Sequence, residues 1–212
     1  MSYGVAAGCP IERGMTRPLT QYELEVLPTL PVGPCELIVD GEHFARVVKN
    51  GMAKAKVSLD IMTADFKAML VPTMRKGRRG RGAESIVQVF RRLAERGVEI
   101  RILHAGTPSA AALLELKREL PGNLVIRRCP RLHAKAVVID ARAMYLGSAN
   151  LTGAGLGAKA DGRRNFEMGV WTEGAVMIEA VMGQFNLLWE GRQCGKCKRK
   201  DVCPVPLEEP EL

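Results

Sequence analysis

The chain has 212 residues, an apolar fraction of 47% and a formal net charge of +8. This length and apolar content suffice for one ordinary domain, and no apolar run approaches the roughly 18 residues of a membrane-spanning helix. The first residues lack the basic start and apolar stretch of a secretory signal, so we expect a cytoplasmic protein without a transmembrane segment. Its basic surface favours polyanions such as nucleic acid or anionic lipid.

Composition divides the chain into three parts. Residues 1–34 contain five prolines and no clear period, which predicts an N-terminal arm with a short helix at 21–27. Residues 35–190 alternate between strand-like and helix-like patterns. Residues 191–212 form a cysteine-rich tail. The alternation predicts an α/β domain with a mixed sheet flanked by helices.

Hydrophobic periodicity predicts the order of elements within this domain. Helices are expected over residues 42–55, 84–96, 109–120 and 175–189. Strands are expected over residues 56–65, 98–105, 124–128, 136–140, 144–150 and 166–171.

The most informative stretch reads HAKAVVIDARAMYLGSAN, from His133 to Asn150. Alternate side chains of a strand share a face, so His133 and Lys135 should point the same way. A hairpin turning near residues 141–143 would return Ser148 and Asn150 to their side. A histidine can act as a nucleophile, and the other side chains are donors suited to phosphate oxygens. The stretch therefore indicates attack on a phosphodiester.

The spacing H-x-K-x(4)-D-x(6)-G-S-x-N, followed by an N-x-E that ends at Glu167, resembles the phospholipase D superfamily. The resemblance covers roughly residues 35–190 and implies that superfamily's fold and a metal-independent phosphodiesterase with a phosphohistidine intermediate. It implies that His133 is the nucleophile and that Glu167 braces it. The implied phosphate-binding residues are Lys135, Ser148 and Asn150. Asp140 belongs to the motif, and at a strand end it is expected either to join the site or to cap the turn.

The motif occurs once, whereas the mechanism that the resemblance implies uses two histidines. Neither His43 nor His104 heads a second H-x-K. A homodimer with its twofold axis through the active site is the simplest solution, because a twofold interface is self-complementary. A heterodimer with a related chain and an inactive relic are the alternatives. His104, at a strand end, is expected to make a local hydrogen bond or to line the cleft.

Two basic groups are candidates for nucleic-acid contact. The first is a glycine-interleaved cluster, expected to be a loop that contacts the phosphate backbone or is simply solvated: Arg75, Lys76, Arg78, Arg79 and Arg81. The second is the pair Arg163 and Arg164, which is near the motif in sequence and is expected near the scissile phosphate.

The tail cysteines Cys194, Cys197 and Cys203 have the spacing C-x(2)-C-x(5)-C. Two thiolates of a C-x-x-C can reach one ion, so we expect a structural metal site. The candidates for a fourth ligand are Cys9, Cys35 and Cys129, although Cys129 is also compatible with a buried strand position. The tail also resembles the iron–sulfur clasp of some RecB-like nucleases, so zinc and a cluster both fit. Disulfides and unligated thiols are the alternatives.

Three functions are compatible with these patterns. The first is a homodimeric nuclease that acts on DNA or RNA without a catalytic cofactor, which the basic charge and the single motif favour. The second is a phospholipase D or phosphatidyl transferase that acts on lipid phosphodiesters, for which the sequence offers no membrane anchor. The third is a non-catalytic nucleic-acid-binding module that uses the motif to grip phosphate.

Overall fold

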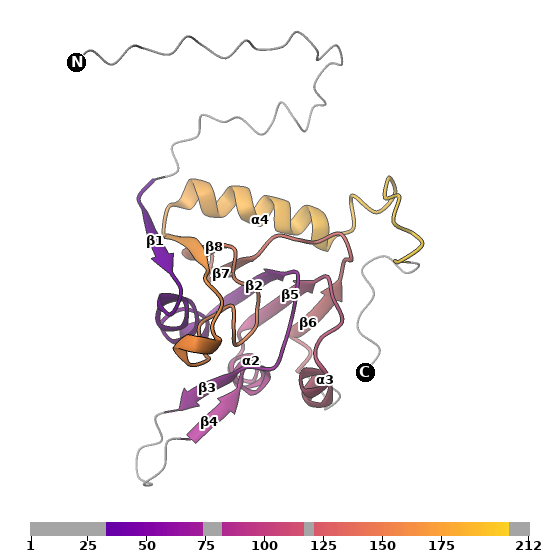
Figure 1. The fold of residues 1–212 in the computed structure, drawn as a ribbon. Coiled ribbons are helices and arrows are strands. Elements are labelled where there is room, and N and C mark those ends of the chain that lie inside the picture. The colour runs from indigo at the N-terminus through magenta and orange to yellow at the C-terminus, as the bar shows by residue number, and fades with distance from the viewer. Residues whose placement is uncertain (1–32, 74–81, 117–120, 204–212) are drawn as a thin grey trace, which may run out of the picture. The chain divides into compact units, whose positions relative to one another are not determined.

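The structure, a computed structural model, describes residues 33–73, 82–116 and 121–203 (Figure 1). A seven-stranded sheet has the strand order β1-β9-β8-β7-β2-β5-β6. Its strands are β1 (Cys35–Val39), β2 (Ser58–Thr63), β5 (Glu99–His104), β6 (Leu124–Arg128), β7 (Ala136–Ile139), β8 (Ala143–Gly147) and β9 (Met168–Thr172). A separate two-stranded sheet pairs β3 (Leu70–Thr73) with β4 (Gly82–Ser85).

The main sheet is mixed, as the sequence predicts. Strands β2, β5 and β6 pair in parallel, and β7, β8, β9 and β1 continue the sheet in antiparallel pairs. The parallel strands require crossovers, which contain the helices α2 (Ile86–Ala94) and α3 (Ala110–Leu116). The antiparallel strands β7 and β8 form the predicted hairpin. The expected α/β domain with a mixed sheet is confirmed.

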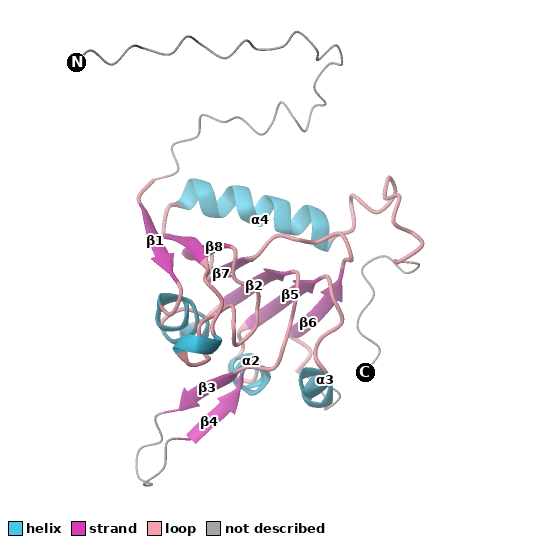
Figure 2. Cartoon of the chain, in the orientation of Figure 1, coloured by secondary structure: helices cyan, strands magenta, loops and turns pink. Residues whose placement is uncertain are grey.

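Helices cover both faces of this sheet (Figures 1 and 2). The helix α4 (Ala175–Trp189), which has the predicted bounds, packs through Ile178 and Phe185 against one face. On the other face, the buried side chains of α2 join the main core cluster with Ile100 and Tyr145. This division follows from the alternation of side chains along each strand, because neighbouring residues such as Ile102 and Leu103 belong to different clusters.

The structure differs from the predicted elements in three places. The single helix expected over residues 42–55 is instead a π-helix, η1 (Phe44–Lys49), followed by a 3-10 turn, η2 (Met52–Lys54). Strand β1 was not predicted because it is an edge strand with mostly exposed residues, which hides the alternation of a half-buried strand. Strands β3 and β4 were also missed, since Pro72 argues against a strand except at an edge. The predicted helix at 21–27 lies outside the described residues.

Candidate active site

The start of β7 brings His133 and Lys135 together. Both residues precede the strand, and the Lys135 carbonyl accepts a hydrogen bond from the Gly147 N–H at 3.1 Å, so backbone pairing with β8 extends to Lys135. The Lys135 Nζ lies 3.1 Å from each ring nitrogen of His133 and donates to the His133 carbonyl at 2.7 Å. The histidine is exposed, whereas Lys135 is only 8% exposed. The ring is therefore accessible from solvent, with a cation held beside it.

The ammonium group of Lys135 is poorly solvated. Burial lowers the pKa of Lys135 below its usual value, and the negative charge of Glu167 opposes this effect. A buried cation that lacks solvation is stabilised by an anion. The position thus suits a phosphate oxygen, whose charge would add to that of Glu167.

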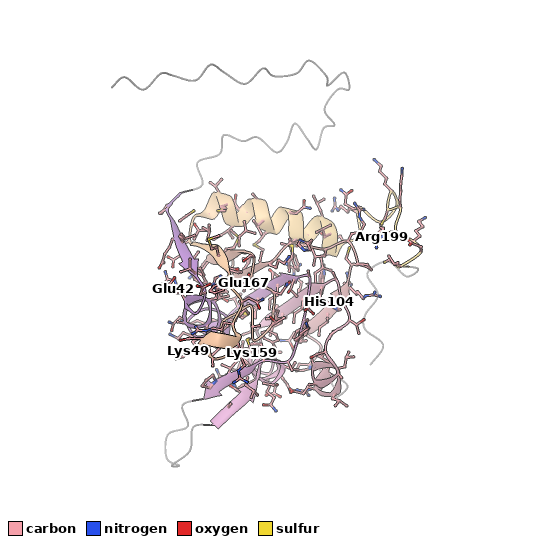
Figure 3. All side chains as sticks on the ribbon, in the orientation of Figure 1. Glu42, Lys49, His104, Lys159, Glu167 and Arg199 are labelled. Carbon is pink, nitrogen blue, oxygen red and sulfur yellow. The ribbon has the colours of Figure 1, made fainter. Side chains whose placement is uncertain are left out.

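Glu167 lies beside Ser148 at the same end of the hairpin and is labelled in Figure 3. Its carboxylate, 8% exposed, accepts hydrogen bonds from the Ser148 hydroxyl and, at 3.0 Å, from the Asn165 side chain. Its backbone is fixed by Asp40, whose carboxylate accepts from the Glu167 N–H at 2.9 Å. Within the described part of the chain, Glu167 bonds to Ser148 and Asn165 rather than to His133.

Asp140 directly follows the last residue of β7, at the opposite end of the strand from His133 and Lys135. Its carboxylate accepts from the backbone N–H groups of Lys56, Val57 and Ser58 at 3.0, 2.7 and 3.0 Å. Its backbone is left-handed, with φ of 54°, as the tight turn into β8 requires. Asp140 therefore joins the β7–β8 turn to the start of β2, the structural alternative.

Asn150 also serves the fold through its side-chain oxygen. That oxygen accepts from the hydroxyl of Thr63 at 3.3 Å and from the N–H groups of Ala64 and Asp65 at 3.1 Å each. The Thr63 hydroxyl in turn accepts from the Leu151 N–H at 2.9 Å. These bonds hold the segment after β8 against the end of β2. The expected phosphate contact of Asn150 would therefore have to use its amide nitrogen.

Tyr145 supports the site but was not singled out by the sequence. It is fully buried, and its hydroxyl accepts from the Ala149 N–H at 2.9 Å. Burial, with a smaller contribution from the charge of Glu167, raises the pKa of Tyr145 to about 12, while the bond from Ala149 opposes the shift. A Cβ atom at Gly147 or Gly169 would overlap the tyrosine side chain. Gly147, the glycine of the Gly-Ser pair, therefore leaves the space that the tyrosine side chain occupies.

The other two histidines of the chain are fully buried. His43 and His104 are each 0% exposed. The Nδ1 of His43 lies 2.9 Å from the Asp40 carbonyl, and its ring packs edge-on against Tyr145. The Nδ1 of His104 lies 2.7 Å from the Gly106 carbonyl, so His104 makes the expected local hydrogen bond. Since the chain has three histidines, His133 is the one that solvent can reach.

The predicted basic residues are only partly described. Arg163 is exposed at the end of a 3-10 turn, η3 (Asp161–Arg163). Arg164 forms an ion pair with Asp161, so its charge is partly compensated within the protein. The cluster Arg75, Lys76, Arg78, Arg79 and Arg81 lies outside the described residues, between β3 and β4.

Comparison with known proteins identifies the family of the chain. Residues 48–189 match the family model described as "Cardiolipin synthase, PLD-like domain". This match spans more than half of the chain, so the protein belongs to the phospholipase D-like family. No curated protein matches the chain.

Solved structures share the fold at low identity. NucT from Helicobacter pylori is 17% identical with a TM-score of 0.54, covering 74% of this chain and 96% of NucT. Nuc from Salmonella typhimurium, a phospholipase D family member, is 20% identical with a TM-score of 0.53, covering 74% and 95%. The polyphosphate kinase of Porphyromonas gingivalis is 16% identical with a TM-score of 0.50, covering 81% and 29%.

Proposed function

We propose that this protein is a metal-independent nuclease that cleaves DNA or RNA with His133 as its nucleophile, acting as a homodimer. The observation that carries the proposal is the pairing of an exposed His133 with a buried lysine, with both ring nitrogens 3.1 Å from Lys135 Nζ. A nucleophile beside a fixed cation is the arrangement that attack on a phosphodiester needs.

The chemistry follows from the side chains at this end of the hairpin. A ring nitrogen of His133 attacks phosphorus while Lys135 holds a nonbridging oxygen, and the phosphorus–oxygen bond to the leaving group breaks. The leaving oxygen takes a proton from a second histidine. Water, deprotonated by that histidine, then attacks the phosphohistidine and releases His133. Glu167 keeps the Ser148 hydroxyl in place through their hydrogen bond.

A second copy of the chain is the source of the second histidine. His43 and His104 are 0% exposed, so neither can protonate a leaving group on a bound substrate. Exposed apolar side chains near Glu167 support a protein partner: Phe166 is 95% and Met168 65% exposed. Met168 pairs in register with Val39 of β1, and nearby Leu37 is 66% exposed. Apolar surface of this kind is typical of interfaces.

Charge favours a nucleic acid as substrate. The net charge is +8, and three basic side chains, Lys49, Arg92 and Arg96, line a pocket of about 620 Å³ beside β3 and β4. Arg92 is partly neutralised by Glu84, at 2.8 Å. The strands β3 and β4 flank the predicted nucleic-acid-binding cluster. The names of NucT and Nuc, two solved structures with this fold, also favour a nucleic acid as substrate.

A lipid phosphodiester is the second candidate, because the exposed apolar side chains of β1 and β9 also suit a membrane surface. No helix among residues 33–73, 82–116 and 121–203 is long and apolar enough to cross a bilayer. Parallel assays of labelled single- and double-stranded DNA, RNA and phospholipid vesicles, all in excess EDTA, separate the two candidates.

The decisive comparison is wild type against His133→Ala, with Arg142→Ala at the far end of the hairpin as the control. We expect cleavage of nucleic acid by wild type and Arg142→Ala, and none by His133→Ala, which should still bind nucleic acid. Turnover of lipid alone would overturn the nuclease assignment. Binding without turnover of any substrate would favour a non-catalytic module.

Mixing the two proteins tests the shared site. If each active site needs two copies of His133, an equal amount of His133→Ala that exchanges freely should reduce wild-type activity to about half, because mixed dimers are inactive. Unchanged activity after verified subunit exchange would show that one chain forms a complete site.

A further inference from the structure

Four cysteines belong to two neighbouring segments, Cys129 to the β6–β7 loop and Cys194, Cys197 and Cys203 to the tail. The tail starts after Trp189, the last residue of α4, whose carbonyl accepts from Arg127 of β6 at 2.9 Å. The Arg127 guanidinium also lies 4.6 Å from the centre of the Trp189 ring. Cys129 packs against the same apolar cluster as Trp189. The β6–β7 loop and the beginning of the tail are therefore neighbours.

Turns in the tail bring its cysteines back toward this loop. The Cys197 N–H donates to the Cys194 carbonyl at 3.1 Å, which closes a turn over the C-x-x-C pair. The backbone N–H of Arg199 and the side chain of Arg131 both hydrogen-bond to the Cys197 thiol. Arg131 follows Cys129 by two residues, so the loop reaches the tail directly. Figure 3 shows Arg199 in the tail beyond the end of α4.

The thiol of Cys194 lies close enough to Cys129, Cys197 and Cys203 for their charges to interact with it. All of these cysteines are free thiols, as is the exposed Cys35 of β1. Four thiolates repel one another unless a cation lies between them.

We propose that Cys129, Cys194, Cys197 and Cys203 together bind one Zn²⁺ ion through four thiolates. Tetrathiolate coordination is the usual form of a structural zinc site. In the described part of the chain, no three His, Cys or carboxylate side chains yet have an arrangement that could hold an ion, so binding must draw the thiols together. This assignment selects Cys129 over Cys35 as the fourth ligand.

The ion would fix the segment that leads to His133. The Cys129 N–H donates to the His104 carbonyl at 2.8 Å, and its own carbonyl accepts from the Leu132 N–H at 2.9 Å. Leu132 is buried and directly precedes His133. A metal at Cys129 would therefore link the tail to the backbone that positions the histidine. The assignment of the ion does not depend on the proposed nuclease activity.

Metal analysis of the purified full-length protein tests the proposal. We expect about one zinc per chain in wild type and in the control Cys35→Ser, and loss of most of the zinc in Cys129→Ser and Cys194→Ser. No zinc in wild type after reduction and incubation with the ion would overturn the proposal. Iron with the visible absorption of a cluster, or disulfides among these cysteines, would overturn it as well.

Cobalt substitution identifies the ligands even if Cys129→Ser does not fold. Co²⁺ at a tetrahedral thiolate site absorbs in the visible range and through thiolate-to-metal charge transfer. Cys129→His should retain the ion, since histidine also binds zinc and cobalt, and should shift this spectrum because nitrogen replaces one sulfur. A spectrum identical to wild type would show that Cys129 is not a ligand.

Discussion

The two ends of the β7–β8 hairpin contain different residues of one motif, and these residues have different roles. At the end with His133 and Lys135, polar groups face one another and solvent, and the lysine charge is poorly solvated. At the other end, the carboxylate of Asp140 accepts hydrogen bonds from backbone N–H groups at the start of β2. A single stretch of sequence thus contains both reactive groups and the bonds that hold them in position.

The difference has an energetic basis. Hydrogen bonds to a carboxylate are stronger than neutral ones, about 1.5–3 kcal/mol each, so Asp140 stabilises the fold. A desolvated ammonium group such as Lys135 contributes little to stability or opposes it, which is typical of functional sites. Substitutions at the two ends should therefore separate activity from stability.

The largest expected effect is on catalysis by Lys135→Met. Removing a cation that stabilises charge in the transition state should lower kcat/KM by about 10²–10³-fold. The free energy of unfolding should stay the same or rise, because a buried charge is lost. Steady-state kinetics and urea denaturation measure the two quantities. A variant that keeps wild-type kcat/KM, or that is inactive only because it unfolds, would contradict this role for Lys135.

Asp140→Ala should show the opposite pattern. Loss of the bonds to the backbone of Lys56, Val57 and Ser58 should lower the free energy of unfolding by about 2–3 kcal/mol. Activity per folded molecule at low temperature should stay within about twofold of wild type, because Asp140 lies away from the reacting end. Glu179→Ala, at an exposed position of α4, is the control for removing a carboxylate. Wild-type stability combined with lost turnover would place Asp140 in the chemistry after all.

Much of the fold could be predicted from the sequence because its central elements have strong periodicity. The predicted bounds of α4 are those observed, and the β7–β8 hairpin turns where expected. The edge strand β1 and the β3–β4 pair were missed, since their residues are largely exposed or include Pro72. Edge strands lack the buried face that produces a clear alternation.

The candidate site was predictable only in part. The spacing placed His133 beside Lys135, but it could not show that Asp140 and the Asn150 side-chain oxygen bond to segments near β2. Those partners are more than 80 residues away in sequence. The need for Gly147 beside the ring of Tyr145 likewise depends on packing between strands. Local spacing identifies reactive groups, whereas the role of each residue depends on distant partners.

The smallest expected effect links Glu167 to the ionisation of Lys135. The charge of Glu167 raises the pKa of Lys135 against the lowering caused by burial. In Glu167→Gln that support is lost, so Lys135 should release its proton at lower pH than in wild type. The alkaline limb of the profile of kcat/KM against pH should therefore move to lower pH.

Lys135→Arg is the control for this prediction, because a guanidinium stays charged throughout the accessible range. The pH profile of Lys135→Arg should have no alkaline limb that arises from position 135. The double variant with Glu167→Gln should also lack this limb. If the alkaline limb of Glu167→Gln lies at the same pH as in wild type, a group other than Lys135 causes it. The effect of Glu167 would then be confined to its bond with Ser148, and the reactive end of the hairpin would depend on hydrogen bonding rather than on the charge state of its lysine.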